Sequence, residues 1–176
     1  MRIITGQFKG RRFDIPRTFK ARPTTDFAKE NIFNVLNGYI DFDGITALDL
    51  FAGTGSISLE LISRGCKEVV SIEKDRDHAH FIVECMKKIN VENNILIRGD
   101  VFRFLKSCRQ KFGFIFADPP YALPELDTLP DLIFEYDLLT ADGVFVFEHG
   151  KHNDFSAHTH FKEHRSYGSV NFSIFR

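Results

Sequence analysis

The chain has 176 residues, of which 43% are hydrophobic and 27% charged, and its formal net charge of −1 at pH 7 is typical of one globular domain with a sizeable core. No apolar run approaches the roughly 20 residues of a membrane helix, and no apolar segment follows the basic start as in a signal peptide, so we expect a cytoplasmic protein with no membrane partner. Cys66, Cys85 and Cys108 are odd in number and widely spaced, which argues against a disulfide framework and against a Cys-X-X-Cys metal site.

The first thirty residues have a basic bias that the net charge conceals. They hold eight basic and three acidic residues, a charge of +5, and the rest of the chain is at −6. We expect two short strands, at 2–4 and 10–15, around a turn at 6–9. Three phenylalanines interleave with the charges, namely Phe8, Phe13 and Phe19. Such a hairpin could contact phosphates and stack exposed bases, and the alternative is a solvated hairpin of ordinary positive charge.

A helix is expected to follow and to run to about Asn37, with Thr24 or Thr25 as its N-cap. The apolar residues recur at helical spacing. They predict a buried stripe of Phe27, Ile32, Phe33 and Leu36. This helix would lie across the pocket that the next segments form.

A strand at 45–52 runs directly into Gly53-Thr54-Gly55, the glycine turn, and then into a helix at 56–64. Glycines permit backbone angles that other residues resist and let a ligand approach the chain closely, while the helix N-terminus offers unpaired N–H groups. The turn therefore suits a nucleotide-like ligand. A dinucleotide fingerprint needs a third glycine where this chain has Ser58, which disfavours a nicotinamide-dependent oxidoreductase.

Two further strands end in acids. The strand at 68–72 leads to Glu73, eighteen residues after Gly55, where α/β folds place an acid on ribose hydroxyls. The strand at 94–98 leads to Asp100, whose carboxylate could accept a hydrogen bond from an exocyclic amine. Either acid alone is more readily interpreted as a solvated charge at a strand end, but the two in series support a nucleoside cofactor.

Asp118, Pro119, Pro120 and Tyr121 form a corner after the apolar strand 114–117. A carboxylate and a proline-fixed backbone carbonyl are both hydrogen-bond acceptors, and the next ring can stack on a flat group held between them. This Asp-Pro-Pro-Tyr corner therefore suits the amino group of a nucleobase. The alternative is a turn that only ends the strand, since Asp and Pro favour turns.

The remaining elements complete an α/β pattern, with helices near 75–90, 101–110 and 124–137 and strands near 143–148, 161–166 and 169–175, the last two as an antiparallel pair. Five histidines lie near the C-terminus, but no Cys or carboxylate constellation completes a site, so we expect no metal. His149 follows Glu148 at the end of the fifth strand, and its role stays open.

Four strand ends thus carry the glycine turn led by Asp49, two further acids and the Asp-Pro-Pro-Tyr corner, and ligands of open parallel α/β sheets bind outside the carboxyl ends of the strands. With this pattern the sequence resembles the Rossmann-like S-adenosylmethionine-dependent amino-methyltransferases, most closely the RsmD type that methylates guanine N2 of small-subunit ribosomal RNA. The resemblance extends over 1–176 and includes Met1-Arg2-Ile3-Ile4-Thr5-Gly6, Arg22-Pro23-Thr24-Thr25-Asp26, Ile32-Phe33-Asn34-Val35-Leu36 and Tyr167-Gly168.

The resemblance implies an α/β Rossmann-like methyltransferase fold in one domain, 1–176. Its sheet would be mostly parallel and seven-stranded, with a C-terminal antiparallel strand pair, helices on both faces, and an N-terminal β-hairpin extension at 1–22 for RNA recognition. Lys29 stands where arginine is usual in this family, and Ser166 stands where a basic residue is usual.

The resemblance also assigns roles to residues. The cofactor S-adenosyl-L-methionine would be bound by Asp49, Phe51, Ala52, Gly53, Thr54, Gly55, Glu73, Lys74, Asp100 and Val101, with Glu73 on the ribose and Asp100 and Val101 at the adenine. The target amine would be received by Asp118, Pro119, Pro120 and Tyr121. RNA would be bound by Arg2, Lys9, Arg11, Arg12, Arg22, Thr24, Thr25 and Lys29.

The expected function is therefore methylation of a guanine N2 in 16S rRNA, by a monomer without metal, within a partly or fully assembled 30S subunit. An adenine amine in DNA or RNA is the first rival, because the Asp-Pro-Pro-Tyr corner suits both bases. A noncatalytic RNA-binding assembly factor is a rival of another class, and only cofactor turnover would exclude it. Protein glutamine methylation is disfavoured, because those relatives usually carry Asn where this chain has Asp118.

Overall fold

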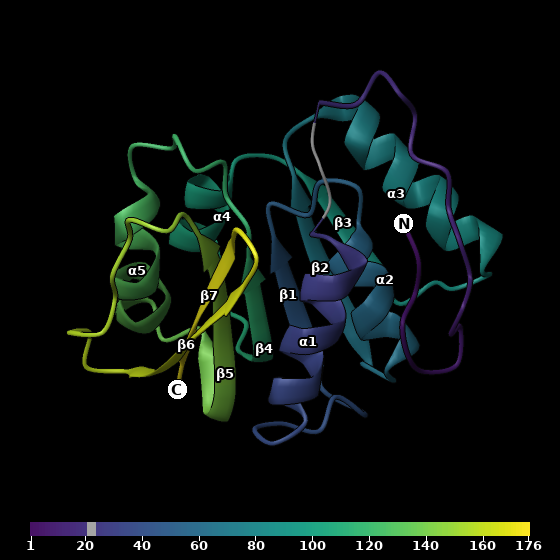
Figure 1. The fold of residues 1–176 in the computed structure, drawn as a ribbon. Helices are drawn as coiled ribbons and strands as arrows, with labels where there is room; N and C mark the ends of the chain where they lie inside the picture. Colours follow the sequence, from purple (N-terminus) through teal and green to yellow (C-terminus); the bar gives the residue numbers. More distant parts are fainter. Residues whose placement is uncertain (21–23) are drawn as a thin grey trace.

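A seven-stranded sheet forms the centre of the computed structural model, which describes residues 1–20 and 24–176 (Figure 1). The strand order is β3-β2-β1-β4-β5-β7-β6. The strands are β1 (Thr46–Leu50), β2 (Glu68–Glu73), β3 (Asn94–Arg98), β4 (Phe112–Ala117), β5 (Leu139–His149), β6 (Phe161–Tyr167) and β7 (Val170–Phe175). β1 to β5 are parallel, whereas β7 is antiparallel to both β5 and β6, which confirms the predicted sheet.

Helices cover both faces of this sheet (Figure 1). They are α1 (Asp26–Leu36), α2 (Ser56–Ser63), α3 (Arg76–Lys88), α4 (Val101–Ser107) and α5 (Leu129–Glu135), with a 3-10 turn η1 (Leu126–Thr128) before α5. On one face α1, α2 and α3 bury Phe33, Ile57 and Ile82 in a common cluster, and on the other α4 and α5 bury Leu105 and Ile133. The carboxyl ends of the five parallel strands meet at one edge, where the predicted site residues follow them.

Two further observations concern membrane-spanning helices and the cysteines. Within the described residues, no helix has both the length and the apolar character needed to cross a bilayer. All three cysteines are free thiols in the interior.

The predicted helix α1 is present but turned differently about its axis. Thr25 is its N-cap, and the Thr25 hydroxyl accepts a hydrogen bond from the N–H of Ala28 at 3.1 Å. Phe27 was expected in the buried stripe, but its side chain is 65% exposed. Ala28 and Lys29 occupy the buried positions with Ile32, Phe33 and Leu36, so the apolar stripe begins one residue later than the hydrophobicity of Phe27 indicated.

Three other predicted boundaries were wrong. The helix expected at 124–137 is shorter, because α5 begins at Leu129 with Pro130 in its first turn, the only place where a helix tolerates proline well. α4 ends at Ser107, before the extended backbone of Cys108. β5 begins at Leu139, which pairs with β4 through a register shift.

Residues 1–20, the arm, lie against α2 and α3 and not in the sheet (Figure 1). The two segments expected to be short strands pair around an antiparallel bridge between Arg2 and Arg12, although neither is long enough to form a regular strand. The N–H of Ile3 donates to the carbonyl of Arg11, and the N–H of Phe13 donates to that of Met1, both at 3.0 Å. The backbone also binds α2, because the Glu60 carboxylate accepts from the N–H groups of Ile4 and Thr5 at 2.8 and 3.0 Å. Tertiary hydrogen bonds to α2 thus add to the short hairpin pairing within the arm.

Gly6 is required where the arm meets α2. Its φ of +87° is in the left-handed region, and a Cβ there would lie 1.8 Å from the carbonyl oxygen of Ser63. Ser63 also binds the arm directly, because its carbonyl accepts from the N–H of Gln7 and its hydroxyl from the N–H of Phe8.

Lys29 connects the arm, α1 and α2 through a buried ion cluster. Its ammonium donates to the carbonyl of Arg2 at 2.6 Å and to Ser56 Oγ at 2.9 Å, and it lies 3.8 Å from Glu60 Oε2. Arg64 pairs with the other Glu60 oxygen at 3.0 Å. Burial lowers the pKa of Lys29, an effect that Glu60 opposes. With 1% of its surface exposed, Lys29 lies out of reach of RNA, so the resemblance-based role does not fit its position.

Glu60→Gln should destabilise the fold by about 3–5 kcal/mol, because it leaves two buried cations without their carboxylate and weakens two backbone hydrogen bonds. Denaturant unfolding measures the free energy. The matched control is Glu84→Gln on the surface of α3, where the partner Lys87 is exposed and little change in stability is expected. Equal losses in the two variants would contradict a stabilising role for the buried cluster.

Candidate functional site

The glycine turn joins β1 to α2 in a backbone conformation that a ligand site requires. Gly53 and Gly55 have φ of +56° and +78°. A Cβ on Gly55 would lie 2.9 Å from Ile82 Cγ1, whereas a Cβ on Gly53 would meet no atom closer than the Phe51 carbonyl oxygen at 3.8 Å. Phe51 itself has a φ of 61°, which is strained for an aromatic residue. Such strain concentrates at ligand sites.

Glu73, at the end of β2, hydrogen-bonds to the backbone of this turn. Its carboxylate accepts from the N–H of Gly53 at 2.6 Å and from the N–H of Asp75 at 2.7 Å. Each oxygen keeps a lone pair for a further donor. Nearby, the Thr54 hydroxyl is buried with no hydrogen-bond partner among the described residues. An unpaired buried hydroxyl in a glycine turn fits a polar ligand that would bind there.

Asp49 lies on β1 beneath the turn, with only 2% of its surface exposed. Its carboxylate accepts from the Ser58 hydroxyl at 2.5 Å. Burial raises its pKa from 3.8 to about 7, helped by Glu73 and opposed by the hydrogen bonds from Ser58. A cation bound beside Asp49 would favour the ionised form, so the buried acid suits a positively charged ligand.

Asp100 follows β3 and caps α4, where its carboxylate accepts from the N–H of Arg103 at 3.0 Å. With Ile97 and Gly99 it borders a surface cavity of about 570 Å³ beside α4. Val101 is buried in the adjacent core. Lys74, beyond β2, is exposed.

The Asp-Pro-Pro-Tyr corner follows β4 at the same edge. β4 pairs with β5 so that Ala117 lies opposite Phe147, and this register puts Asp118 beside Glu148. Glu148 accepts from the Tyr121 hydroxyl and from the Thr24 hydroxyl, both at 3.0 Å. The corner is thus closed by a second acid and by the residue that precedes the N-cap of α1.

Charge repulsion and burial act together at the corner. Burial raises the pKa of Asp118, and the carboxylates of Glu148 and Asp49 raise it further. Burial also raises the pKa of Glu148, although its two hydroxyl donors lower it. The pKa of Tyr121 is raised by burial and by Glu148. A row of acids on neighbouring strands therefore favours ligands that bring N–H donors or positive charge.

Sequence reasoning noted Glu148 only as the neighbour of His149. The available signal was its place at the carboxyl end of the fifth parallel strand, which is where the other acids lie. His149 points to the opposite face, since successive strand residues alternate. Its ring is buried and bonded to the Gly150 carbonyl and the Ser173 hydroxyl, and burial lowers its pKa, so its place is structural.

The described residues that were predicted to bind RNA differ in their exposure and in their contacts. Lys9 and Arg12 are exposed. Arg11 donates to the carbonyl of Lys88 at 3.0 Å, and Arg2 lies 3.6 Å from Asp26. Thr24 and Thr25 are engaged at Glu148 and at the cap of α1. Arg22 is outside the described residues.

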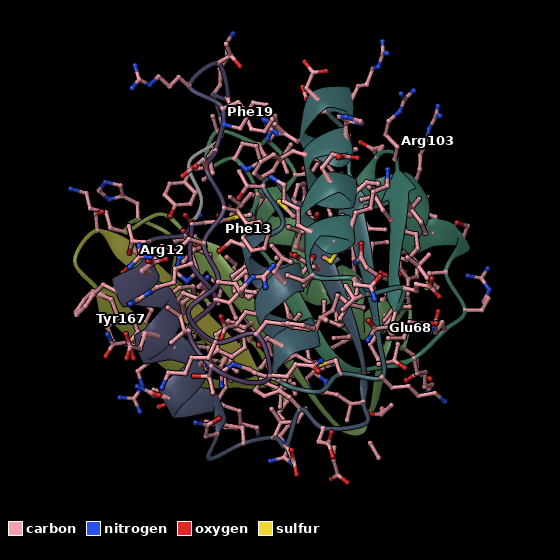
Figure 2. All side chains as sticks on the ribbon, turned by 90° about the vertical axis from the view of Figure 1, so that its right-hand side faces the viewer. Arg12, Phe13, Phe19, Glu68, Arg103 and Tyr167 are labelled. Carbon is pink, nitrogen blue, oxygen red and sulfur yellow. The ribbon has the colours of Figure 1, made fainter. Side chains whose placement is uncertain are left out.

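The arm phenylalanines anchor the arm rather than extend from it. Phe13 is 4% exposed, and Phe19 packs on His78 and Phe81 of α3 (Figure 2). Phe8 is partly buried against the same core. The apolar rings thus cover the helices beneath, which does not favour the expected stacking of bases on them. The exposed aromatic side chains include Phe27 and Tyr121.

Comparisons with known proteins identify relatives of this chain. The family model described as "Conserved hypothetical protein 95" matches residues 1–176. "Putative rRNA methyltransferase YlbH" of Bacillus subtilis is 37% identical over 155 residues, covering 86% of this chain and 83% of that protein. "Ribosomal RNA small subunit methyltransferase D" of Haemophilus influenzae is 31% identical over 152 residues, covering 84% and 78%. A solved structure of a hypothetical protein from Thermus thermophilus superimposes with a TM-score of 0.87 at 26% identity, covering 100% and 99%.

Proposed function

The chain belongs to the conserved hypothetical protein 95 family and is a methyltransferase of the RsmD type, and we propose that it transfers a methyl group from S-adenosylmethionine to the N2 amine of a guanine in 16S ribosomal RNA. The observation that carries the proposal is the Asp-Pro-Pro-Tyr corner beside Glu148, at the same sheet edge as the glycine turn. The names of relatives support small-subunit rRNA as the substrate.

The cofactor site would be built from the glycine turn and the acids around it. Glu73 would hold the ribose, Asp100 and Val101 would meet the adenine, and Asp49 would attract the positively charged methionine end. The free Thr54 hydroxyl and the open space before Gly53 fit such a ligand. S-adenosylmethionine supplies the methyl group as an activated sulfonium, so that an N–C bond forms and an S–C bond breaks with its electron pair left on sulfur. The amine would pass its proton to Asp118 or to water.

The residues of the corner would act by positioning the amine. Guanine N2 is a poor nucleophile because its lone pair is delocalised into the ring. Acceptors at Asp118 and at the Pro119 carbonyl would bind its two N–H groups and aim the lone pair at the methyl carbon. Tyr121, 49% exposed, would stack on the base, a contact that contributes roughly 1–3 kcal/mol. A base within a helix would have to flip out.

The experiment that tests the function is transfer of a labelled methyl group from S-adenosylmethionine to 30S subunits that lack the modification, followed by nucleoside digestion and mass spectrometry. Labelled N2-methylguanosine in 16S rRNA is expected. Labelled adenine would promote an adenine methyltransferase instead. Cofactor binding without transfer to either naked 16S rRNA or 30S subunits would favour a noncatalytic assembly factor.

Arg12→Glu should weaken RNA binding and lower the slope of log affinity against log salt by about 1, because the exposed guanidinium would contact phosphate. Filter binding to 16S rRNA over a salt series measures both quantities. The control is Lys111→Glu, a change from a basic residue to the same acid just before β4, away from the predicted site edge, which also breaks an exposed ion pair with Asp137. The same slope for Arg12→Glu as for the unmodified protein would remove the arm from the proposed RNA interface.

A further inference from the structure

We infer that Glu148 reads the Watson–Crick edge of the target base by accepting the N1–H of guanine, beside the amine held at Asp118. The inference rests on the proposed function and goes beyond it, because it assigns the choice of base to a residue outside the Asp-Pro-Pro-Tyr corner. Its first support is position. The register of β4 and β5 puts Glu148 next to Asp118 at the carboxyl edge, and Asp118 and Glu148 extend from neighbouring parallel strands.

The second support is the hydrogen-bonding state of Glu148. Hydroxyls of Tyr121 and Thr24 each donate to one of its oxygens, Oε1 and Oε2 respectively. Two donors favour a carboxylate that accepts only, and each oxygen keeps a lone pair for a further donor. Asp118 is close enough for its carboxylate and that of Glu148 to affect each other, and a proton bound by this pair is better placed on Asp118, which lacks the two hydroxyl donors.

The third support is the chemistry of the purine edges. Guanine presents N1–H next to its N2 amine, so two adjacent acceptors match two adjacent donors. Adenine presents an unprotonated N1 next to its N6 amine, and an ionised Glu148 would face that lone pair without a proton between them. A carboxylate here therefore favours guanine and opposes adenine, even though the Asp-Pro-Pro-Tyr corner suits either amine. An unpaired buried acceptor is the basis of strong discrimination.

The test uses reconstituted small subunits that carry either guanine or 2-aminopurine at the position identified by the transfer assay. 2-Aminopurine keeps the N2 amine but has no N1–H. The unmodified enzyme should prefer guanine by roughly 10- to 100-fold in kcat/KM. Glu148→Gln should reduce this ratio by roughly tenfold or more, because an amide can turn to donate to an unprotonated N1. The affinity of Glu148→Gln for S-adenosylmethionine, measured by calorimetry, should stay unchanged, which would show that the variant is folded.

Tyr121→Phe separates reading from positioning. It removes one donor to Glu148 but leaves the carboxylate and its second donor, the Thr24 hydroxyl, so activity should fall while the guanine to 2-aminopurine ratio is kept. Three outcomes would overturn the inference while transfer to guanine continues. The unmodified enzyme could show a guanine to 2-aminopurine ratio near one, or Glu148→Gln could leave the ratio unchanged. Tyr121→Phe could also lower the ratio as much as Glu148→Gln does. No transfer to guanine subunits would overturn the proposed function, and the inference with it.

Discussion

Asp118→Ala should lower methyl transfer by at least about 100-fold and leave S-adenosylmethionine affinity nearly unchanged, since the proposed role of Asp118 is to hold the target amine and not the cofactor. Single-turnover transfer and calorimetry measure the two quantities. Asp118→Asn, which keeps one acceptor oxygen, should retain more activity than Asp118→Ala. The control is Asp142→Ala in the same sheet, whose carboxylate is 95% exposed, and no loss of transfer is expected there.

Asp118→Ala should not destabilise the fold. The pKa of Asp118 is raised in the folded state, so ionising this group lowers stability as the pH rises above the ordinary carboxyl range. Alanine removes that effect and relieves repulsion with Glu148. A loss of cofactor binding in Asp118→Ala, with the fold intact, would assign Asp118 to the methyl-donor side of the site.

Asp49→Asn should weaken S-adenosylmethionine binding and remove most of its pH dependence. In the free protein the pKa of Asp49 is about 7, so at about pH 5 the group is neutral and at about pH 8 it is charged. The affinity for the cationic donor should therefore rise with pH through this window, and more steeply than that for S-adenosylhomocysteine, which lacks the sulfonium charge. Calorimetry with both ligands at the two pH values gives the ratio.

Asp49 also links pH to stability with the opposite sign. Its folded pKa of about 7 lies above 3.8, so between these values the unfolded chain binds fewer protons and stability falls as the pH rises. Asp49→Asn should therefore reduce the loss between about pH 5 and about pH 8, by at most about 3 kcal/mol. Asparagine can still accept from Ser58. Parallel pH profiles of stability in the two proteins would contradict an elevated pKa.

Local chemistry made much of the fold predictable. Thr25 caps α1, glycines end β1, and acids follow β2 and β3, because each of these residues satisfies a short-range requirement of its own segment. The boundaries of β3 were predicted to the residue. These features let the topology and the sheet edge that carries the candidate site be inferred from the sequence.

The errors arose where distant segments decide. Lysine is usually a surface residue, but Lys29 is held in the interior by Glu60 and the carbonyl of Arg2. Phe13 and Phe19 belong to a basic segment, but they cover helices that are formed much later in the chain. Glu148 could not be joined to Asp118 without the register of β4 and β5. Residue type alone does not contain this information.

The hydrogen bond from Thr24 to Glu148 spans 124 positions of the chain, and the bonds from the arm to α2 span 55 to 58. During synthesis the N-terminal residues emerge first. The arm therefore cannot bind α2 until Glu60 and Ser63 have left the ribosome. Glu148 reaches its place beside Asp118 only when β5 follows. The proposed binding site for 16S rRNA is thus among the last features of this protein to form while a ribosome synthesises it.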